Sequence, residues 1–134
     1  MIYALDSDII SAILKRDVEI IARFHKIRPK NEFVIPPIVF YEIERGLLSG
    51  NLLAKRRIFM EFCKDVEIGE FSFNVWQKAA EIYATLSKQG NPIGGKYDGD
   101  YFIAAYCVVN DYTLITGNKD HFNRIDGLKF TNWK

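Results

Sequence analysis

The stretch "YALDSDIIS" (residues 3–11) decides the fold, because an apolar run ends there in an acid and a helical pattern follows at once. Acids are poor strand residues, and a carboxylate is costly to bury without a partner. We therefore expect residues 2–5 to form a buried strand that ends at Asp6. A helix capped by Ser7 then continues through Leu14.

Beyond this stretch, short apolar runs alternate with helical patterns along the chain. Further strands are expected at residues 32–37, 66–71, 112–116 and 128–130. Further helices are expected at residues 18–27, 36–47, 50–64, 72–89 and 100–109. This alternation predicts an α/β fold with a mainly parallel central sheet that helices flank on both faces. A chain of 134 residues has room for one such domain, so the domain is expected to span residues 1–134.

Two of these helices have patterns that predict how they pack. Over residues 72–89, apolar side chains recur at spacings of three and four, and Ser72 occupies the capping position. The apolar face predicted for this helix consists of Trp76, Ala79, Ala80, Tyr83 and Leu86. The helix over residues 100–109 is hydrophobic on nearly all sides, so we expect it to be buried.

The charge balance excludes one class of nucleic-acid binder. The chain has 18 basic and 17 acidic residues, which gives a formal charge of +1. A protein that binds nucleic acid by charge alone is strongly basic. Any nucleic acid would therefore be held here by local basic patches or through metal ions.

The cysteines and histidines narrow the class further. Cys63 and Cys107 lie far apart in hydrophobic surroundings, which predicts buried free thiols in a reducing compartment. His25 and His121 are the only histidines, so neither a zinc site nor a Ser-His-Asp triad has a strong basis. No apolar run reaches the length that spans a membrane. We expect a cytoplasmic protein without membrane contact.

Polar side chains fall at four points in the predicted order of elements. Asp6 ends the first strand, Glu42 lies one turn into the helix after the second strand, and Asp100 opens the buried helix. Asn118 and Asp120 follow the fourth strand. In an open α/β sheet, ligands bind in the crevice at the carboxyl ends of the strands. We therefore expect these side chains, far apart in sequence, to converge at one edge of the sheet.

Carboxylates that converge in this way need protons or cations. Two of them about 5 Å apart repel by roughly 3 kcal/mol at an effective dielectric near 20. Because the chain offers carboxylates and no cluster of His or Cys, Mg²⁺ or Mn²⁺ is the expected counterion. Such ions activate water and stabilise a phosphodiester during its hydrolysis, as in two-metal nucleases.

Each acid alone also has an ordinary structural interpretation. Asp6 could be a strand-end or capping residue, Glu42 a solvated helix residue, and Asp100 a helix-start acid that the macrodipole stabilises. Asp98 fits a loop or cap position, and Glu44 a surface or structural one. The ordered set, and no single member, favours a metal site.

Four stretches resemble the PIN-domain ribonucleases, and most closely the VapC toxins of bacterial and archaeal toxin–antitoxin pairs. They are "MIYALDSDIISAIL" (1–14), "VIPPIVFYEIERGL" (34–47), "KQGNPIGGKYDGDYFIAAYC" (88–107) and "YTLITGNKDHFNRIDGL" (112–128). The resemblance covers nearly the whole chain. It implies Asp6, Glu42 and Asp100 as catalytic, metal-ligating acids, with Asn118 as a fourth, often weaker position.

The chain departs from the family pattern at two positions near these acids. Asp8 stands where relatives usually have Asn or Ser, and His121 stands where an acid is common. Asp120 could substitute from the neighbouring position, or Asn118 could complete the site alone. Asp8, Asp98 and Asp120 are therefore kept as additional candidate site residues.

The resemblance also implies a substrate and partners. Relatives cleave RNA, often tRNA or ribosomal RNA, and so slow translation. A cognate VapB-type antitoxin inhibits them by placing its C-terminal segment in the acidic groove, and the toxins are typically homodimers. Side chains on the two helices expected to meet an antitoxin are Leu47, Leu48, Leu52, Leu53, Phe59 and Phe62, although core packing explains most of them equally well.

Two other functions remain open from the sequence. The pair Asp6 and Asp8 after a strand looks like the nucleophile and acid/base of haloacid-dehalogenase-type phosphatases, but Ala104 stands where that family has a further acid. A degenerate PIN domain that only binds its partner would also fit the weakened fourth position. The three intact acids Asp6, Glu42 and Asp100 argue against a pure scaffold.

Overall fold

The central sheet has five parallel strands in the order β3-β2-β1-β4-β5. The structure is a computed structural model that describes residues 1–94 and 97–134. The strands are β1 (Ile2–Leu5), β2 (Glu32–Ile35), β3 (Glu67–Ile68), β4 (Thr113–Thr116) and β5 (Lys129–Asn132). The helices are α1 (Ser7–Leu14), α2 (Val18–Ile27), α3 (Pro37–Ser49), α4 (Leu53–Asp65), α5 (Phe73–Lys88), α6 (Gly99–Asn110) and α7 (Lys119–Phe122), with a 3-10 turn at Arg28–Lys30.

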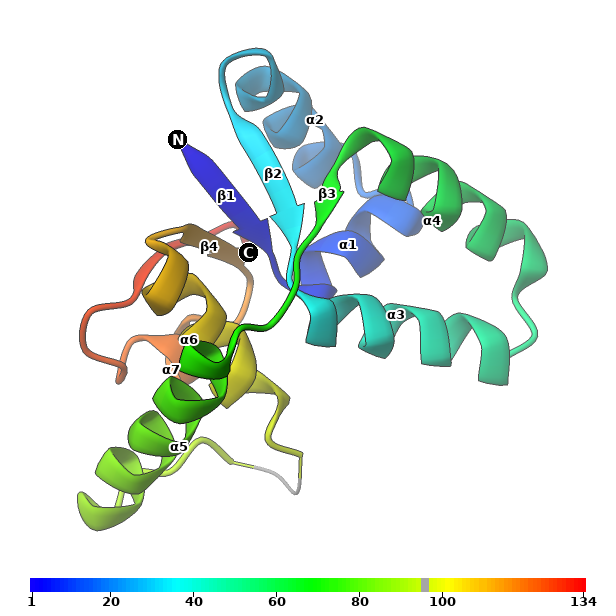
Figure 1. Ribbon diagram of the computed structural model, residues 1–134. Coiled ribbons are helices and arrows are strands. Elements are labelled where there is room, and N and C mark those ends of the chain that lie inside the picture. The colour runs from blue at the N-terminus through cyan, green and yellow to red at the C-terminus, as the bar shows by residue number, and fades with distance from the viewer. Residues whose placement is uncertain (95–96) are drawn as a thin grey trace.

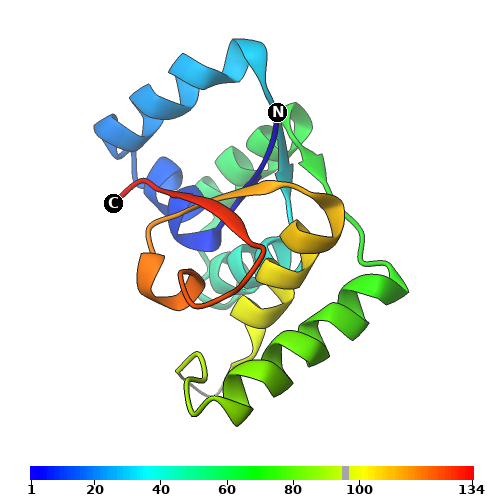
Figure 2. The ribbon, with the colours of Figure 1, turned by 90° about the vertical axis from the view of Figure 1, so that its left-hand side faces the viewer.

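Helices cover both faces of the sheet, as the alternation of elements predicts. Figure 1 shows α1 to α4 on one side of the strands and α5 to α7 on the other. After a quarter turn, α2 and α5 lie at opposite ends of the molecule (Figure 2). In the described part of the chain, no helix is long and apolar enough to cross a membrane.

The first strand lies at the centre of the sheet and brings together segments that are distant in sequence. In its register, Ala4 pairs with Val34 of β2 and with Leu114 of β4. These side chains are buried, because helices cover both faces. Since β1, β2 and β4 are parallel, their carboxyl ends meet at one edge, from which α1, α3 and the turn before α7 begin. This edge carries the predicted acids.

Most predicted elements are confirmed, but the edge strand β3 is shorter than predicted and the other edge strand, β5, extends two residues beyond the predicted end at 130. The helix that begins after Pro36 is α3, and the helix hydrophobic on nearly all sides is α6, whose buried residues include Tyr101, Ile103 and Cys107. Only Glu67–Ile68 of the predicted strand 66–71 pairs with β2, because the chain then leaves the sheet toward α5. Cys63 and Cys107 are free, the second fully buried and the first partly exposed.

The prediction that Ser7 caps the first helix is wrong. The cap is Asp6, whose side chain accepts a hydrogen bond from the backbone N–H of Ser7, the first helical residue. A carboxylate at this position accepts a backbone N–H that the helix itself leaves free.

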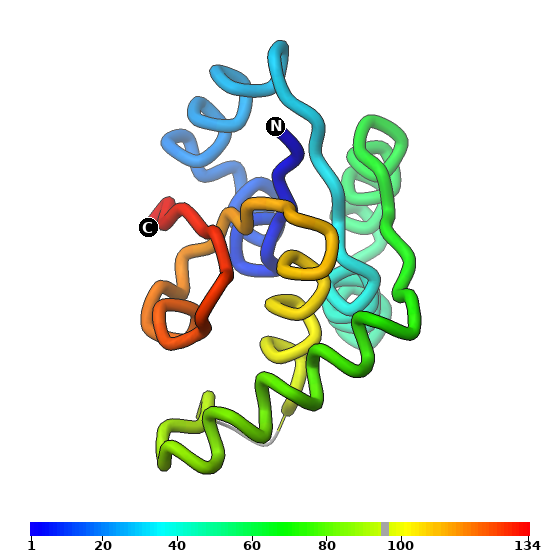
Figure 3. Tube along the Cα trace, turned by 60° about the vertical axis from the view of Figure 1, so that its left-hand side comes forward, coloured from blue at the N-terminus to red at the C-terminus, as the bar shows by residue number. Residues whose placement is uncertain are grey.

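The apolar face predicted for the helix over 72–89 is also partly wrong. The buried side chains of α5 are Val75, Ala79, Ile82 and Leu86. Trp76 and Tyr83 are 53% and 50% exposed, respectively. Figure 3 shows α5 crossing α6 and running along the end of the molecule. The helix buries the face next to the predicted one, and Trp76 and Tyr83 stay half exposed, with one side of each ring against Phe102 and Tyr101, respectively.

Candidate active site

Asp6 lies at the carboxyl end of the central strand and is almost fully buried. Its Oδ1 accepts a hydrogen bond of 2.7 Å from the Ser7 backbone N–H, and its Oδ2 accepts one of 2.7 Å from the Thr116 hydroxyl. Burial and the charge of Asp8 raise the pKa of Asp6 from 3.8 to about 7, against the lowering effect of these hydrogen bonds. A buried carboxyl group with a pKa near neutrality is the perturbation that functional sites often contain.

Glu42 enters the same edge from α3. The helix starts at Pro37, whose fixed backbone angle suits the first helical position, so Glu42 stands in its second turn. Its Oε1 is buried and has no hydrogen-bond partner among residues 1–94 and 97–134. Burial, followed by the charges of Asp6 and Asp100, raises the pKa of Glu42 from 4.5 to about 7.

Asp100 lies in the first turn of α6 and contacts the segment after β4. Its Oδ2 is 2.5 Å from Nδ1 of His121. The same imidazole nitrogen is 2.9 Å from the side-chain amide nitrogen of Asn118. The backbone N–H of Asn118 donates to the Thr116 hydroxyl, which in turn donates to Asp6. Asp6, Thr116 and Asn118 are thus joined by hydrogen bonds, and His121 joins Asn118 to Asp100.

Asp8 also lies in the cluster. Its Oδ2 accepts a hydrogen bond of 2.9 Å from the Gly117 backbone N–H, and its Oδ1 is buried without a partner. Burial is the main cause that raises its pKa, and the charge of Asp100 adds to it. A Cβ on Gly117 would stand 2.6 Å from this carboxylate, so only glycine allows the close approach.

The structure therefore brings together most, but not all, of the predicted site residues. Asp98 and Asp120 are exposed, and neither is among the acids whose charges raise the pKa of Asp6 or Glu42. Asp120 uses its backbone carbonyl to hold the side chain of Arg124. The acids at the sheet edge are Asp6, Asp8, Glu42 and Asp100, and Asn118 reaches them through His121.

The sequence did not point to three of the residues that support these acids. Thr116 is the last residue of β4 and Gly117 follows it. In the sequence, His121 is distinguished only as a departure from the family pattern. Thr116 is fully buried, which is unusual for a polar residue and reflects its hydrogen bond to Asp6. A polar residue at the end of a buried strand, next to the strand that ends in Asp6, is the signal that could have found it.

The donor atoms of this cluster fit a hard divalent ion. They are carboxylate oxygens, and two of them, Oδ1 of Asp8 and Oε1 of Glu42, are buried without a partner, which is costly unless a proton or cation compensates. Their charges interact, yet among residues 1–94 and 97–134 no three His, Cys, Asp or Glu side chains are grouped closely enough to hold an ion. The acids are neighbours that an ion would draw closer.

Aromatic and basic side chains border the acids. The guanidinium of Arg45 lies 5.2 Å from the ring centroid of Tyr41 and 4.9 Å from that of Tyr97. All three side chains are exposed, and the charge of Arg45 lowers the pKa that burial raises at Glu42. The arrangement offers a positive charge and flat rings beside the carboxylates.

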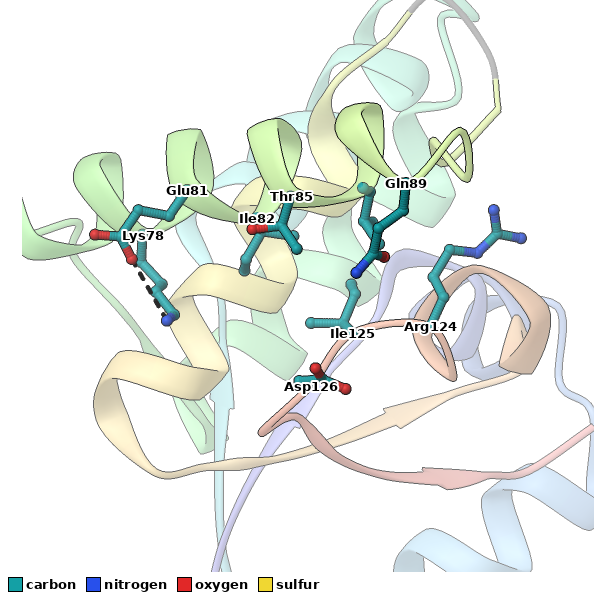
Figure 4. Close-up of a pocket in the computed structure, with 9 residues that line it drawn as sticks. Lys78, Glu81, Ile82, Thr85, Gln89, Arg124, Ile125 and Asp126 are labelled. Atoms are coloured by element: carbon teal, nitrogen blue, oxygen red, sulfur yellow. Dashed lines mark ion pairs between the residues drawn. The ribbon is translucent and has the colours of Figure 1, made fainter.

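A separate pocket lies between α5 and the segment after α7 (Figure 4). Its lining consists of Lys78, Glu81, Ile82, Thr85, Leu86, Gln89, Arg124, Ile125 and Asp126. Lys78 and Glu81 pair at 3.5 Å across one turn of the helix. The acids of the sheet edge do not line this pocket, so it is separate from the candidate active site.

A parallel sheet with acids gathered at the carboxyl ends of β1, β2 and β4 matches a known family. The model of the PIN domain matches residues 3–128 of this chain. The chain therefore belongs to the PIN-domain family.

Within that family, its relatives are VapC proteins. Ribonuclease VapC1 of Haemophilus influenzae strain R2866 is 30% identical over 99% of this chain and 98% of its own. Among solved structures, VapBC2 of Rickettsia felis, bound to a DNA fragment from its promoter, matches with a TM-score of 0.90 at 25% identity over the whole of both chains. VapBC-1 of nontypeable H. influenzae matches at 0.85 and 30% identity, covering 99% of this chain and 98% of that one.

Membership of this family removes the phosphatase interpretation of Asp6 and Asp8. Ala104, at the position where that alternative needs a further acid, is fully buried inside α6. Asp8 instead holds the backbone of Gly117 at the edge of the acid cluster.

Proposed function

We propose that this chain is the toxin of a toxin–antitoxin pair, an endoribonuclease that inhibits translation by hydrolysing phosphodiester bonds in tRNA or ribosomal RNA in the cytoplasm. The observation that carries the proposal is the convergence of Asp6, Glu42 and Asp100 at one sheet edge, where burial and mutual repulsion raise the pKa values of Asp6 and Glu42 to about 7. The names of its relatives, which are ribonucleases, support the reaction class.

The cluster would act with Mg²⁺ or Mn²⁺ held by Asp6, Glu42 and Asp100, with Asn118 at a fourth position. Asp8 is the candidate for a further ligand, because its Oδ1 is buried without a partner. When bound, the ion would supply an activated water and stabilise the charge that develops on the phosphate. Asp98 and Asp120, both exposed, are not expected to take part.

The side chains at the border of the site suit an RNA strand. Arg45 offers a cation for a phosphate, and Tyr41 and Tyr97 offer exposed ring faces on which unpaired bases can stack. These groups stand beside Glu42, so a strand held by them would pass over the acids. Local contacts of this kind would let a nearly neutral protein bind a polyanion.

A VapB-type antitoxin is the expected partner, since the similar structures from R. felis and H. influenzae are VapBC complexes. The surface that suits it is the apolar strip along α3, the connection after it and α4, which we define as Leu48, Leu52, Leu53 and Ile58. Leu47 and Phe59, expected from the sequence to lie near an antitoxin, are buried and belong to the core. A homodimer is also expected, and the exposed aromatic side chains of α5 are the surface available to it.

The decisive experiment is cleavage of total bacterial RNA by purified, antitoxin-free protein with Mg²⁺, Mn²⁺ or EDTA. Wild-type protein should give discrete fragments that depend on the metal, and Asp100→Asn should give none although it folds. Asp126→Asn, which changes an exposed acid away from the cluster, is the matched control and should cleave normally.

Intact RNA in every lane, with the protein folded by circular dichroism, would instead favour the degenerate binding module. The ends of the fragments, read by sequencing, would identify the RNA and the cut site.

A further inference from the structure

His121 brings an imidazole nitrogen into a site whose other candidate ligands are oxygens. Its Nδ1 is 2.5 Å from Oδ2 of Asp100 and 2.9 Å from the side-chain nitrogen of Asn118. Asp100 comes from α6, whereas Asn118 and His121 belong to the segment that caps and forms α7. Two separate elements therefore direct three polar groups to one point at the edge of the acid cluster.

These contacts cannot all be ordinary hydrogen bonds in one arrangement. An Nδ1 that donates its proton to Asp100 has no lone pair left to accept from the Asn118 amide. Rotating the amide of Asn118 by half a turn exchanges its nitrogen and oxygen, and the orientation of an amide is assigned from its hydrogen-bond partners. The groups that face each other are then a carboxylate oxygen, an amide oxygen and an imidazole nitrogen. Each of them can bind a metal ion when the proton of the imidazole is on Nε2 and Nδ1 keeps its lone pair.

The position of His121 is fixed by the fold while its ring stays accessible. The neighbouring Phe122 is fully buried and anchors α7, and the His121 backbone N–H donates to the carbonyl of Asn118. The side chain of His121 remains 33% exposed, and that of Asp100 is 24% exposed. An ion from solvent can therefore reach this nitrogen without unfolding of the segment.

We propose that His121 is a direct nitrogen ligand, together with Asp100 and Asn118, and that it gives this site a preference for a first-row transition ion over Mg²⁺. The proposal rests on the proposed function in taking the acid cluster as a metal site. Imidazole favours ions such as Co²⁺, Ni²⁺ and Zn²⁺, whereas Mg²⁺ strongly prefers oxygen ligands. The acids Asp6 and Glu42 would hold either kind of ion.

The first test measures binding of Co²⁺ and of Mg²⁺ by calorimetry, without RNA. We expect His121→Asp to lose Co²⁺ affinity by about tenfold or more, because loss of even an outer-shell partner of a metal ligand costs about 10–100-fold, while its Mg²⁺ affinity is kept or increased. His25→Asn changes the other histidine, which is exposed on α2, and should bind both ions as the wild type does. Equal Co²⁺ affinity in wild type and His121→Asp would overturn the proposal.

A second measurement separates a ligand from a residue that only orients Asp100. Mn²⁺ bound to wild-type protein should show ¹⁴N modulation of its electron spin echo, and the modulation should disappear in His121→Asn, whose amide can still donate a hydrogen bond to Asp100. Modulation that persists in His121→Asn would contradict direct ligation. Neither readout uses RNA, so a protein that binds Co²⁺ through His121 but cleaves nothing would refute the ribonuclease and leave this inference standing.

Discussion

Asp6 has two roles that conflict at neutral pH. As a charged carboxylate it caps α1 and accepts the Thr116 hydroxyl, but as a buried acid beside Asp8 and Asp100 it is stabilised by a proton. Glu42 faces the same conflict between burial and charge, and in the described part of the chain no group donates a hydrogen bond to its buried Oε1. A cation would resolve the conflict by keeping both groups charged and paired.

The direction of these pKa shifts predicts how the free energy of unfolding of the metal-free protein depends on pH. The pKa values of Asp6 and Glu42 rise from 3.8 and 4.5 in the unfolded chain to about 7 in the folded protein. Between these values the folded state binds more protons, so the free energy of unfolding falls as pH rises. The contribution of these two protonated groups to the free energy of unfolding is fully present below their unfolded pKa values. It is lost as the pH rises through their folded pKa of about 7.

In EDTA, we therefore expect the melting temperature of the wild-type protein to be lower above pH 7 than near pH 5. The corresponding decrease should be smaller in Asp6→Asn. The amide cannot ionise, so this variant should have a higher melting temperature than the wild type above the shifted pKa of about 7. Glu61→Gln changes an exposed acid on α4 and should follow the wild type. A lower melting temperature for Asp6→Asn in EDTA would show that repulsion is not what Asp6 contributes.

Tyr97 is predicted to hold RNA and not to take part in the chemistry. Replacing it with Ala removes a stacking surface that contributes about 1–3 kcal/mol per base in single-strand binders. We expect Tyr97→Ala to raise KM by the corresponding factor while kcat changes little. Tyr83→Ala removes an equally exposed ring on α5, away from the acids, and should leave KM unchanged. A fall in kcat alone would assign Tyr97 a role in catalysis.

At the residue scale, the sequence was sufficient to predict that the acids converge at one sheet edge and insufficient to predict their surroundings. Asp6, Glu42 and Asp100 were predictable because parallel topology fixes where strand ends and helix starts meet. The contact between His121 and Asp100 was not, because it depends on the path of a short turn, which has no hydrophobic period. The exposure of Asp120, one residue away, depends on the same turn.

Among the elements, α3 and α4 project together from the sheet as an arm (Figure 1), and the side chains of its apolar strip are exposed. Leu53 is 56% exposed there, although Phe59 on the same helix is fully buried and stacks on Phe40 at 5.6 Å. Exposed apolar patches of this kind mark interaction sites. The arm therefore separates residues that hold the core from residues available to a partner.

We expect Leu53→Lys to weaken binding of the cognate antitoxin by at least about tenfold, because a buried charge without a partner opposes association. Its melting temperature and RNA cleavage should be unchanged, since the side chain is already in solvent. Trp76→Lys on α5 is the matched change on the other exposed surface. It should keep antitoxin affinity and shift the proposed homodimer toward monomer in analytical ultracentrifugation. If Leu53→Lys instead disrupted the dimer and Trp76→Lys weakened antitoxin binding, the two surfaces would have the opposite roles.

The exposed aromatic side chains of α5 also show why sequence alone misplaces a helix face. Val75 and Ile82 recur at the same spacing as Trp76 and Tyr83, one position along, so both sets satisfy the helical period. The packing of α6 against the smaller side chains selects the buried set, and α6 is distant in sequence. Existence and length of the helix were predictable, whereas its rotation was not.

At the scale of the whole molecule, stability depends on β4, because β1 would otherwise be an edge strand. A chain that ends at Asp111 lacks both β4 and β5, exposes one side of β1 and loses the Thr116 partner of Asp6. We expect this chain to show no cooperative thermal unfolding. A chain that ends at Leu128 loses only the edge strand β5 and should still unfold cooperatively at a lower temperature. A cooperative transition in the shorter chain would show that residues 1–111 form a core of their own.

The position of β1 between β2 and β4 has a consequence for the cell that makes this protein. Synthesis proceeds from the N-terminus, so Asp6 leaves the ribosome early, while its partner Thr116, separated by 110 residues, is among the later residues made. Until then, the first strand has only one of its two neighbours, and Asp6 lacks the hydrogen bond from Thr116. On the proposed function, the nuclease is complete only after β4 has docked beside β1, so an antitoxin already present at that moment can bind the toxin as it assembles.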